Sequence, residues 1–110
     1  HEEVVELLLD HGASINQKDS SGCSALYYAS MKEHIKIVKL LVTRGADVKR
    51  KNNDGRSPII IASERRNEKI VELLLSKGAK PNDKDKNGKK TGLEFLRFLL
   101  FKNSNFKGIL

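Results

Sequence analysis

One short phrase occurs three times in this chain, and its spacing restricts the possible fold more than any other feature. The phrase is an apolar run that ends in glycine and alanine, and it occupies Val5–Ala13, Val38–Ala46 and Val71–Ala79. Its glycines lie 33 residues apart, and a second glycine series keeps the same interval at Gly22, Gly55 and Gly88. A repeat of this length is typical of arrays of small helical units.

The composition is that of a folded, soluble chain. Its 110 residues are 38% hydrophobic and 32% charged, within the usual range for globular domains. The single cysteine cannot form an internal disulfide, which favours a reducing compartment. The sequence has no apolar run long enough for a transmembrane helix and no secretory signal at residues 1–3. We therefore expect no membrane contact, and a location in the cytoplasm or nucleus.

Charge is distributed unevenly along the chain. Residues 1–40 carry four Lys against six acidic residues, whereas residues 41–110 carry 17 basic and 8 acidic residues. The second part therefore has a net charge of +9. Such asymmetry favours an acidic protein partner or a nucleic acid. The simpler alternative is a solvated lysine-rich surface that keeps the chain soluble.

Within each period the pattern predicts two short helices followed by a loop. We expect helices over residues 1–9, 25–31, 35–43, 59–62 and 68–76. Ser24 and Ser57 precede the first helix of two copies, where a hydroxyl can accept a bond from a first-turn amide. Pro58 suits the first helical position, since no amide hydrogen is needed there. Gly12 and its repeats suit a helix end with positive φ.

Two complete copies follow the pattern Asp-x-x-Gly-x-Thr-Pro-Leu-His-x-Ala-Ala, then Gly-His, Ile-Val, Leu-Leu and Gly-Ala. The first copy matches at Asp19, Gly22, Ser24, Leu26, Ala29, His34, Ile37, Val38, Leu40, Leu41, Gly45, Ala46 and Asp47. The second matches at Gly55, Ser57, Pro58, Ile59, Ala62, Asn67, Ile70, Val71, Leu73, Leu74, Gly78, Ala79 and Asn82. In these residues the chain resembles ankyrin repeats.

The resemblance implies an all-α solenoid of stacked helix-turn-helix units joined by short hairpin-like loops. It divides the chain into a partial repeat (1–18), two repeats (19–51 and 52–84) and a divergent or truncated C-terminal repeat (85–110). An apolar helix is expected over residues 94–102. Partial repeats at both ends indicate a piece of a longer array. The alternative is that the apolar C-terminal segment is a divergent cap.

The family's histidine is replaced by Tyr27 and Ile60. The family's contact between an imidazole and the capping hydroxyl is therefore missing in both copies. The hydroxyl itself is retained in both, as Ser24 and Ser57. We therefore expect a side-chain cap at the start of both first helices.

Nothing in the sequence predicts catalysis, a metal site or a cofactor. His1 and His34 lie 33 residues apart, which indicates a repeated structural position. Cys23 follows a turn glycine and is expected to be an accessible thiol, but no base is positioned beside it to activate it. We therefore expect no catalytic, cofactor-binding or metal-ligating residue, and a protein that is not an enzyme.

The resemblance places partner recognition on a concave face made by the turn tips and the exposed side of each first helix. The matching positions are Ser20, Ser21, Cys23, Met31, Lys32, Asn53, Asp54, Arg56, Glu64, Arg65, Lys86, Asn87 and Lys89. Met31 could equally pack between helices. Tyr27 and Tyr28 are expected to be buried between repeats. Among these positions Lys32, Arg56 and Arg65 are candidates to bind carboxylates.

Three functions remain open at this point. The first is a protein-interaction module whose basic half favours an acidic protein or peptide. The second is a polyanion or nucleic-acid site on basic loops, formed by Lys49, Arg50, Lys51, Lys84, Lys86, Lys89 and Lys90, although no aromatic residues interleave with them for base stacking. The third is a structural spacer inside a larger protein.

Overall fold

The computed structural model describes residues 2–80, 84–88, 97–98 and 101–102. Its named helices are α1 (Glu2–Asp10), α2 (Ala25–Met31), α3 (Ile35–Thr43), α4 (Pro58–Glu64) and α5 (Glu68–Ser76). The predicted bounds of α2, α3 and α5 are confirmed to the residue. The described residues include no strand, which agrees with the predicted all-α solenoid.

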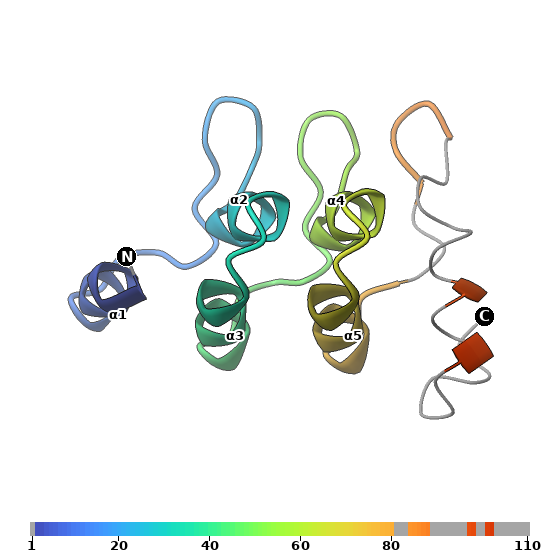
Figure 1. Ribbon diagram of the computed structural model, residues 1–110. Helices are drawn as coiled ribbons and strands as arrows, with labels where there is room; N and C mark the ends of the chain where they lie inside the picture. Colours follow the sequence, from blue (N-terminus) through green and yellow to red (C-terminus); the bar gives the residue numbers. More distant parts are fainter. Residues whose placement is uncertain (1, 81–83, 89–96, 99–100, 103–110) are drawn as a thin grey trace.

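The helices form two layers (Figure 1). Helices α2 and α4 lie side by side in one layer with long hairpin loops above them, and α1, α3 and α5 lie in the other. Each repeat pairs one helix from each layer, α2 with α3 and α4 with α5, and successive repeats meet through α2 with α4 and α3 with α5. The layered stack buries the apolar faces that a single repeat would expose.

The repeated phrase forms the second layer and supplies much of the core. Val38 and Val71 are fully buried at equivalent positions, and Leu41 and Leu74 are 1% and 0% exposed. Between the layers lie small residues, such as Ala62 at 0% exposure, which let the helices approach closely. The phrase is therefore the part of each repeat that stacks on its neighbours, as its periodicity predicts.

Glycine ends each helix of the second layer. Gly12, Gly45 and Gly78 have φ angles of +89°, +93° and +96°, a region where a Cβ atom is disfavoured. Two further residues in this region are not glycines: Glu33 and Arg66, with φ angles of +61° and +55°. They occupy the turns between α2 and α3 and between α4 and α5, where the family pattern has glycine.

The two predicted serine caps differ. Ser24 Oγ accepts a hydrogen bond from the Tyr27 amide at 3.3 Å, as predicted. The prediction for Ser57 is wrong, because its side chain makes no capping bond. The equivalent amide, that of Ile60, donates instead to the Ser57 backbone carbonyl at 3.1 Å. The buried Ser57 hydroxyl then has no hydrogen-bond partner in the described structure.

Part of the C-terminal segment lies beside α5. Residues 97–98 and 101–102 are helical, and Lys102 Nζ lies 2.9 Å from Glu68 Oε1 at the start of α5. The remaining residues of the helix expected over 94–102 lie outside the described residues. The choice between a cap and a truncated repeat lies outside them as well.

Candidate functional site

Each hairpin is shaped by one Asp or Asn side chain. In the first hairpin Asp19 Oδ1 accepts hydrogen bonds from the amides of Ser21 at 3.0 Å and Cys23 at 2.9 Å. The equivalent bonds run from Asp54 and Arg56 to Asn52 Oδ1, and from Asn87 to Asp85 Oδ1. A short side chain that bonds the backbone two and four residues on stabilises a tight turn. The turn tips therefore hold the same conformation in every copy.

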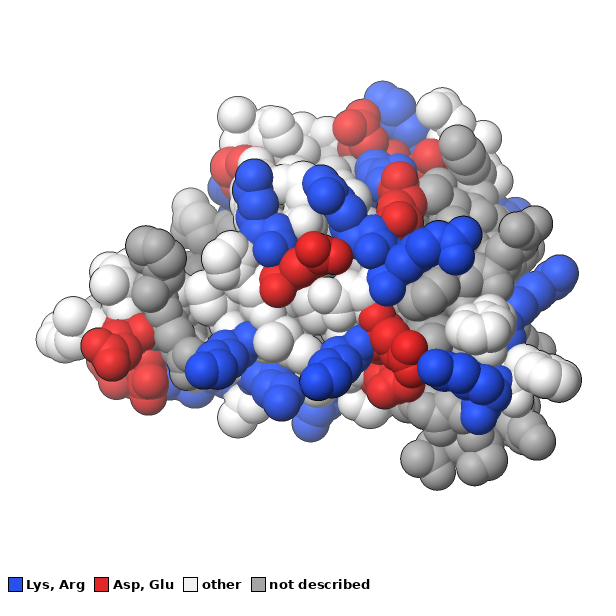
Figure 2. Space-filling view, viewed as in Figure 1, with Lys and Arg blue, Asp and Glu red and all other residues white. Residues whose placement is uncertain are grey.

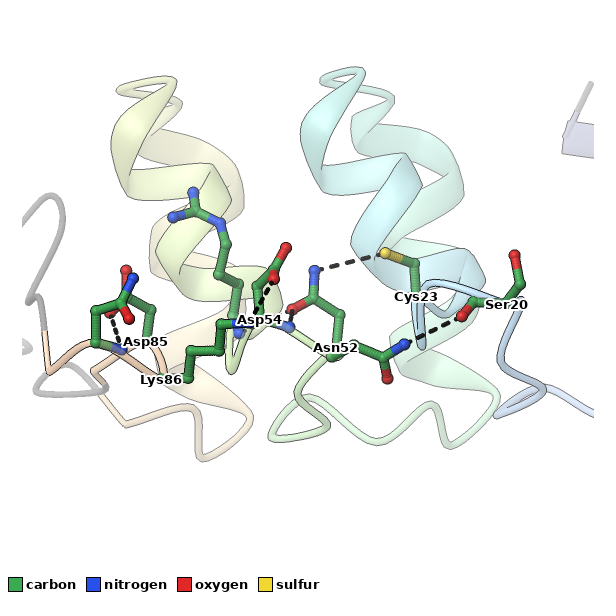
Figure 3. A network of polar contacts seen from close by, with 9 residues as sticks. Ser20, Cys23, Asn52, Asp54, Asp85 and Lys86 are labelled. Carbon is green, nitrogen blue, oxygen red and sulfur yellow. Dashed lines mark hydrogen bonds and ion pairs between the residues drawn. The ribbon is translucent and has the colours of Figure 1, made fainter.

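Neighbouring hairpins are bonded to one another (Figure 3). Asn53 donates to the first hairpin through its backbone amide, which bonds Ser21 O, and its side chain, which bonds Ser20 O, both at 3.0 Å. Lys86 donates its amide to Asp54 O at 2.9 Å, and its Nζ lies 3.4 Å from Asp54 Oδ1. Many of the polar groups predicted to contact a partner therefore join hairpin to hairpin.

This close approach of the hairpins depends on glycine. A Cβ atom at Gly55 would lie 2.5 Å from the backbone nitrogen of Lys86, and one at Gly22 would lie 2.9 Å from that of Asn53. Real Cβ atoms do not come so close to backbone. The second glycine series thus has two roles, since these residues also have positive φ angles of +77° and +75° at Gly22 and Gly55.

The two adjacent tyrosines of α2 have different environments. Tyr27 is 8% exposed, as expected, whereas Tyr28 is 40% exposed and the expectation of burial is wrong for it. The Tyr28 hydroxyl donates a hydrogen bond to Asp19 Oδ2, which ties the hairpin to the helix. This bond lowers the pKa of Asp19, with further help from the Cys23 amide, and raises the pKa of Tyr28.

Cys23 is not an accessible thiol, and that prediction is wrong. The residue is 8% exposed and packs with Tyr27 and Ile61 in a small cluster separate from the main core, with Met31 against its edge. Its Sγ atom lies 3.5 Å from Asn52 Nδ2 of the next hairpin. Packing between two repeats buries it, and a pattern within one repeat does not reveal this. Met31 is half-buried, so it both packs and reaches the surface.

Arg56 is engaged within the protein. Its guanidinium pairs with the Glu64 carboxylate, and its Nε donates to the Tyr27 hydroxyl at 3.3 Å. The Arg56 side chain is 20% exposed. Two predicted partner-binding residues therefore satisfy each other, and Arg56 is poorly placed to clamp a partner's carboxylate.

Lys32 and Arg65 are presented to solvent at equivalent places in two repeats. They are the C-caps of α2 and α4, both are exposed, and neither forms an ion pair with a described residue. Lys36 and Lys69 follow at the starts of α3 and α5 and are also exposed and unpaired within the described structure. These four residues are called the turn-edge cations below. Figure 2 shows several basic side chains on this face, with acidic side chains between them.

The acidic residues near the turn-edge cations are partly neutralised by other groups. Glu64 pairs with Arg56, and Glu68 pairs with Lys102. Glu33 is exposed beside Lys32 and is the acidic residue of the turn after α2. The four turn-edge cations therefore outnumber the acidic side chains along this edge that have no cationic partner in the described structure.

The rival basic loops are less available. Arg50 Nε lies 3.6 Å from Asp47 Oδ2, Lys51 donates to Lys84 O at 3.4 Å, and Lys86 pairs with Asp54. Lys49 is exposed. Lys89 and Lys90 lie outside the described residues, so the predicted contact of Lys89 with a partner stays a prediction. The remaining predicted tip residues, Ser20, Ser21, Asn53, Asp54, Lys86 and Asn87, are exposed.

None of the described helices is long and apolar enough to span a membrane. In the described part of the chain, no group of three or more His, Cys, Asp or Glu side chains is placed to hold a metal ion.

Comparison with known proteins agrees with the two-layer stack of helix pairs and hairpins. A family model described as Ankyrin repeats (3 copies) matches residues 1–85. A search of curated proteins gives no significant match. The family match covers more than half of the 110 residues. The chain therefore belongs to the ankyrin-repeat family.

Proposed function

We propose that this array is a non-enzymatic module that binds an acidic segment of a partner protein across α2 and α4. Ankyrin repeats are generally protein–protein interaction modules. The proposed surface is the concave side of the array, and it runs from Tyr28 on α2 and Glu64, the exposed residue of α4, to the turns that follow these helices. A role in the cytoplasm or nucleus belongs to the same proposal.

The observation that carries the proposal is the repeated presentation of Lys32 and Arg65. Both side chains are exposed at the same register position, and neither is paired with a described acidic residue. Unpaired like charges on adjacent repeats repel each other and add nothing to the stability of the fold. Their favourable interaction is with an anionic ligand, and an acidic segment that crosses both repeats would meet one cation in each.

Apolar surface lies beside these charges. Tyr28 is 40% exposed, and Met31 is half-buried one turn further along α2. A tyrosine ring offers a large contact area with little loss of side-chain entropy, and methionine adapts to differently shaped partners. The favoured ligand is therefore a peptide with carboxylates near an apolar residue, and a bare polyanion would leave this area unused.

The test uses a labelled peptide of glutamates around one leucine, with binding followed by fluorescence anisotropy. The double variant Lys32→Glu/Arg65→Glu should weaken binding by about tenfold or more, since each reversed charge at a rim costs on the order of 1 kcal/mol. The control Lys18→Glu/Lys80→Glu makes the same change in net charge at exposed loop positions that belong to neither candidate surface. Circular dichroism would confirm that both variants fold.

The outcomes separate the three functions. Equal losses in the two variants would show that only overall charge matters, and this would reject the proposed surface. Tighter binding of a labelled oligonucleotide than of the peptide at the same salt concentration would favour the polyanion alternative. No binding to either probe would leave the structural-spacer function as the better account.

A further inference from the structure

We propose that Glu33 and Arg66 determine the order of charges in the bound segment. A basic residue of the ligand lies over repeat 19–51 at Glu33, and its carboxylates lie over repeat 52–84 at Arg66. This inference rests on the proposed function, because it concerns the same surface and adds the charge order that the surface selects. It starts from two equivalent turn positions where the family has glycine and this chain has side chains of opposite charge.

The backbone of the two turns is the same. Glu33 and Arg66 have φ angles of +61° and +55°. Their amides donate to the Ser30 and Ser63 carbonyls at 3.2 and 3.1 Å. In each turn the amide of the following residue donates to the carbonyl five residues earlier, at 3.0 and 3.1 Å. These bonds hold the left-handed turn without any contribution from the side chain, so glycine would adopt the same geometry at a lower cost.

Both turns carry a conformational cost that a glycine would avoid. A Cβ atom in the left-handed region lowers the stability of the fold, and neither residue is Asn or Asp, which tolerate this region best. Backbone outliers of this kind are concentrated at functional sites. Both side chains are exposed, and Glu33 forms no ion pair with a described residue. Their charged groups are therefore within reach of a molecule bound beside the turns.

The exposure of this turn position does not require an open end of the array. Arg66 belongs to a repeat that packs on the preceding one through α2 with α4 and α3 with α5, and it is exposed all the same. Glu33 has the same position in its own repeat. A repeat packed before residues 19–51 would therefore leave Glu33 accessible as well.

The two turns differ in the charges that they present. The turn after α2 combines Lys32 with Glu33, whereas the turn after α4 combines Arg65 with Arg66. A ligand carboxylate is therefore attracted more strongly to the second turn, and a basic ligand residue would be repelled there by two guanidinium groups. The same basic residue can pair with Glu33 at the first turn. Charge complementarity of this kind determines register and partner choice more than it adds to affinity.

The distance between adjacent repeats determines the spacing of these charges in the ligand. The axes of packed helices lie about 8–10 Å apart, and α2 packs on α4. An extended segment advances about 3.3 Å per residue. Ligand residues that are about three positions apart can therefore meet the turns of adjacent repeats. The preferred ligand is an extended segment with a basic residue about three positions from its nearest acidic residue.

The test extends the labelled glutamate–leucine peptide by three residues, of which the last is lysine or alanine, and measures binding by fluorescence anisotropy. One lysine–alanine pair carries the extension at the amino end and a second pair at the carboxyl end, so that either chain direction is covered. The unchanged protein should bind the lysine peptide of at least one pair about threefold more tightly than its alanine counterpart. Glu33→Gln should remove this preference. The control Glu6→Gln, which removes an exposed carboxylate of α1, should retain it.

Glycine variants distinguish a binding role from a structural one. Glu33→Gly should raise the unfolding midpoint and also remove the lysine preference, because the left-handed backbone is relieved of its Cβ atom while the carboxylate is lost. Arg66→Gly should weaken the binding of all four peptides about threefold and keep the ratio within each pair. A side chain without a binding role would show neither change in binding.

The outcomes distinguish the charge order from the surface itself. Equal binding of the lysine and alanine peptides in both pairs would overturn the charge order and leave the surface at Lys32 and Arg65 in place. A lysine preference that survives Glu33→Gln, or unchanged binding by Arg66→Gly, would overturn the roles given to these two residues. If none of the peptides binds, the proposed function is wrong and the charge order is wrong with it.

Discussion

Ser24 and Ser57 occupy the same position in successive repeats, but only the Ser24 hydroxyl is bonded. Ser24 Oγ accepts from the Tyr27 amide, whereas the Ser57 hydroxyl is buried without a partner among the described residues. The difference lies in the equivalent backbone amide of each repeat. The Tyr27 amide bonds the Ser24 hydroxyl, whereas the Ile60 amide bonds the Ser57 carbonyl.

The two serines should therefore respond differently to alanine. Ser24→Ala should lower the free energy of unfolding by about 1 kcal/mol, the usual cost of losing a cap. Ser57→Ala should leave it unchanged or raise it, because removal of an unbonded buried hydroxyl removes a desolvation penalty. Urea denaturation followed by circular dichroism measures both. Equal losses at the two positions would show that Ser57 is bonded in solution.

A comparison of Gly45 with Gly55 distinguishes the effect of backbone conformation on stability from the effect of close packing between hairpins. Both have positive φ angles, but a Cβ atom meets nothing within 4 Å at Gly45 and lies 2.5 Å from Lys86 N at Gly55. Gly45→Ala should cost about 1 kcal/mol, the penalty for a left-handed residue with a side chain. Gly55→Ala should cost clearly more, since the hairpins must also move apart. Comparable unfolding midpoints for the two variants would contradict the close approach of the hairpins.

Replacement of Glu33 by glycine should stabilise the fold. Its φ of +61° lies in the left-handed region, where a residue with a Cβ atom carries a penalty of about 1–2 kcal/mol. Glu33→Gly should therefore raise the free energy of unfolding by roughly 0.5–1 kcal/mol, after allowance for the greater entropy of glycine in the unfolded chain. Lys32→Gly is the matched control, because Lys32 has a φ of −85° and should lose stability. Thermal unfolding would show opposite shifts.

The Tyr28–Asp19 bond should depend on pH at both extremes. The folded-state pKa of Asp19 is depressed, so its contribution is present above the ordinary value of 3.8 and is lost as pH falls through the lower folded value. The folded-state pKa of Tyr28 is raised, so its contribution is present below the ordinary value of 10.0 and is lost as pH rises through the higher folded value. Tyr28→Phe should move the pKa of Asp19 upward in an NMR titration. An unchanged Asp19 titration would show that the backbone amides alone depress it.

Much of the fold could be predicted because the repeat provides several independent copies of each signal. The interval of 33 residues and the helix-ending glycines locate α2, α3 and α5 without any structure. The sequence also indicates the two left-handed turns, because Glu33 and Arg66 occupy positions where the family has glycine.

The candidate site was harder to predict because its contacts cross between repeats. Cys23 is buried by Ile61, 38 residues away in sequence, and Arg56 bonds Tyr27 in the preceding copy. Periodicity shows which positions are equivalent but not which side chains at neighbouring positions meet. Residues with a surface pattern in one repeat can therefore be internal to the stack.

Alanine variants of Arg56 and Arg65 should distinguish a structural role from a binding role. Arg56→Ala should lower the free energy of unfolding by about 1–2 kcal/mol, because it leaves the Glu64 carboxylate and the Tyr27 hydroxyl without their partner in a half-buried place. Arg65→Ala should change stability by less than about 0.5 kcal/mol, as is usual for an exposed, unpaired side chain. Binding of the acidic peptide should show the reverse order, with the larger loss for Arg65→Ala. The proposal would be contradicted if Arg56→Ala abolished binding without loss of stability. In that case the Arg56–Glu64 ion pair would have to break when the ligand binds, and Arg56 would be the binding residue in place of Arg65.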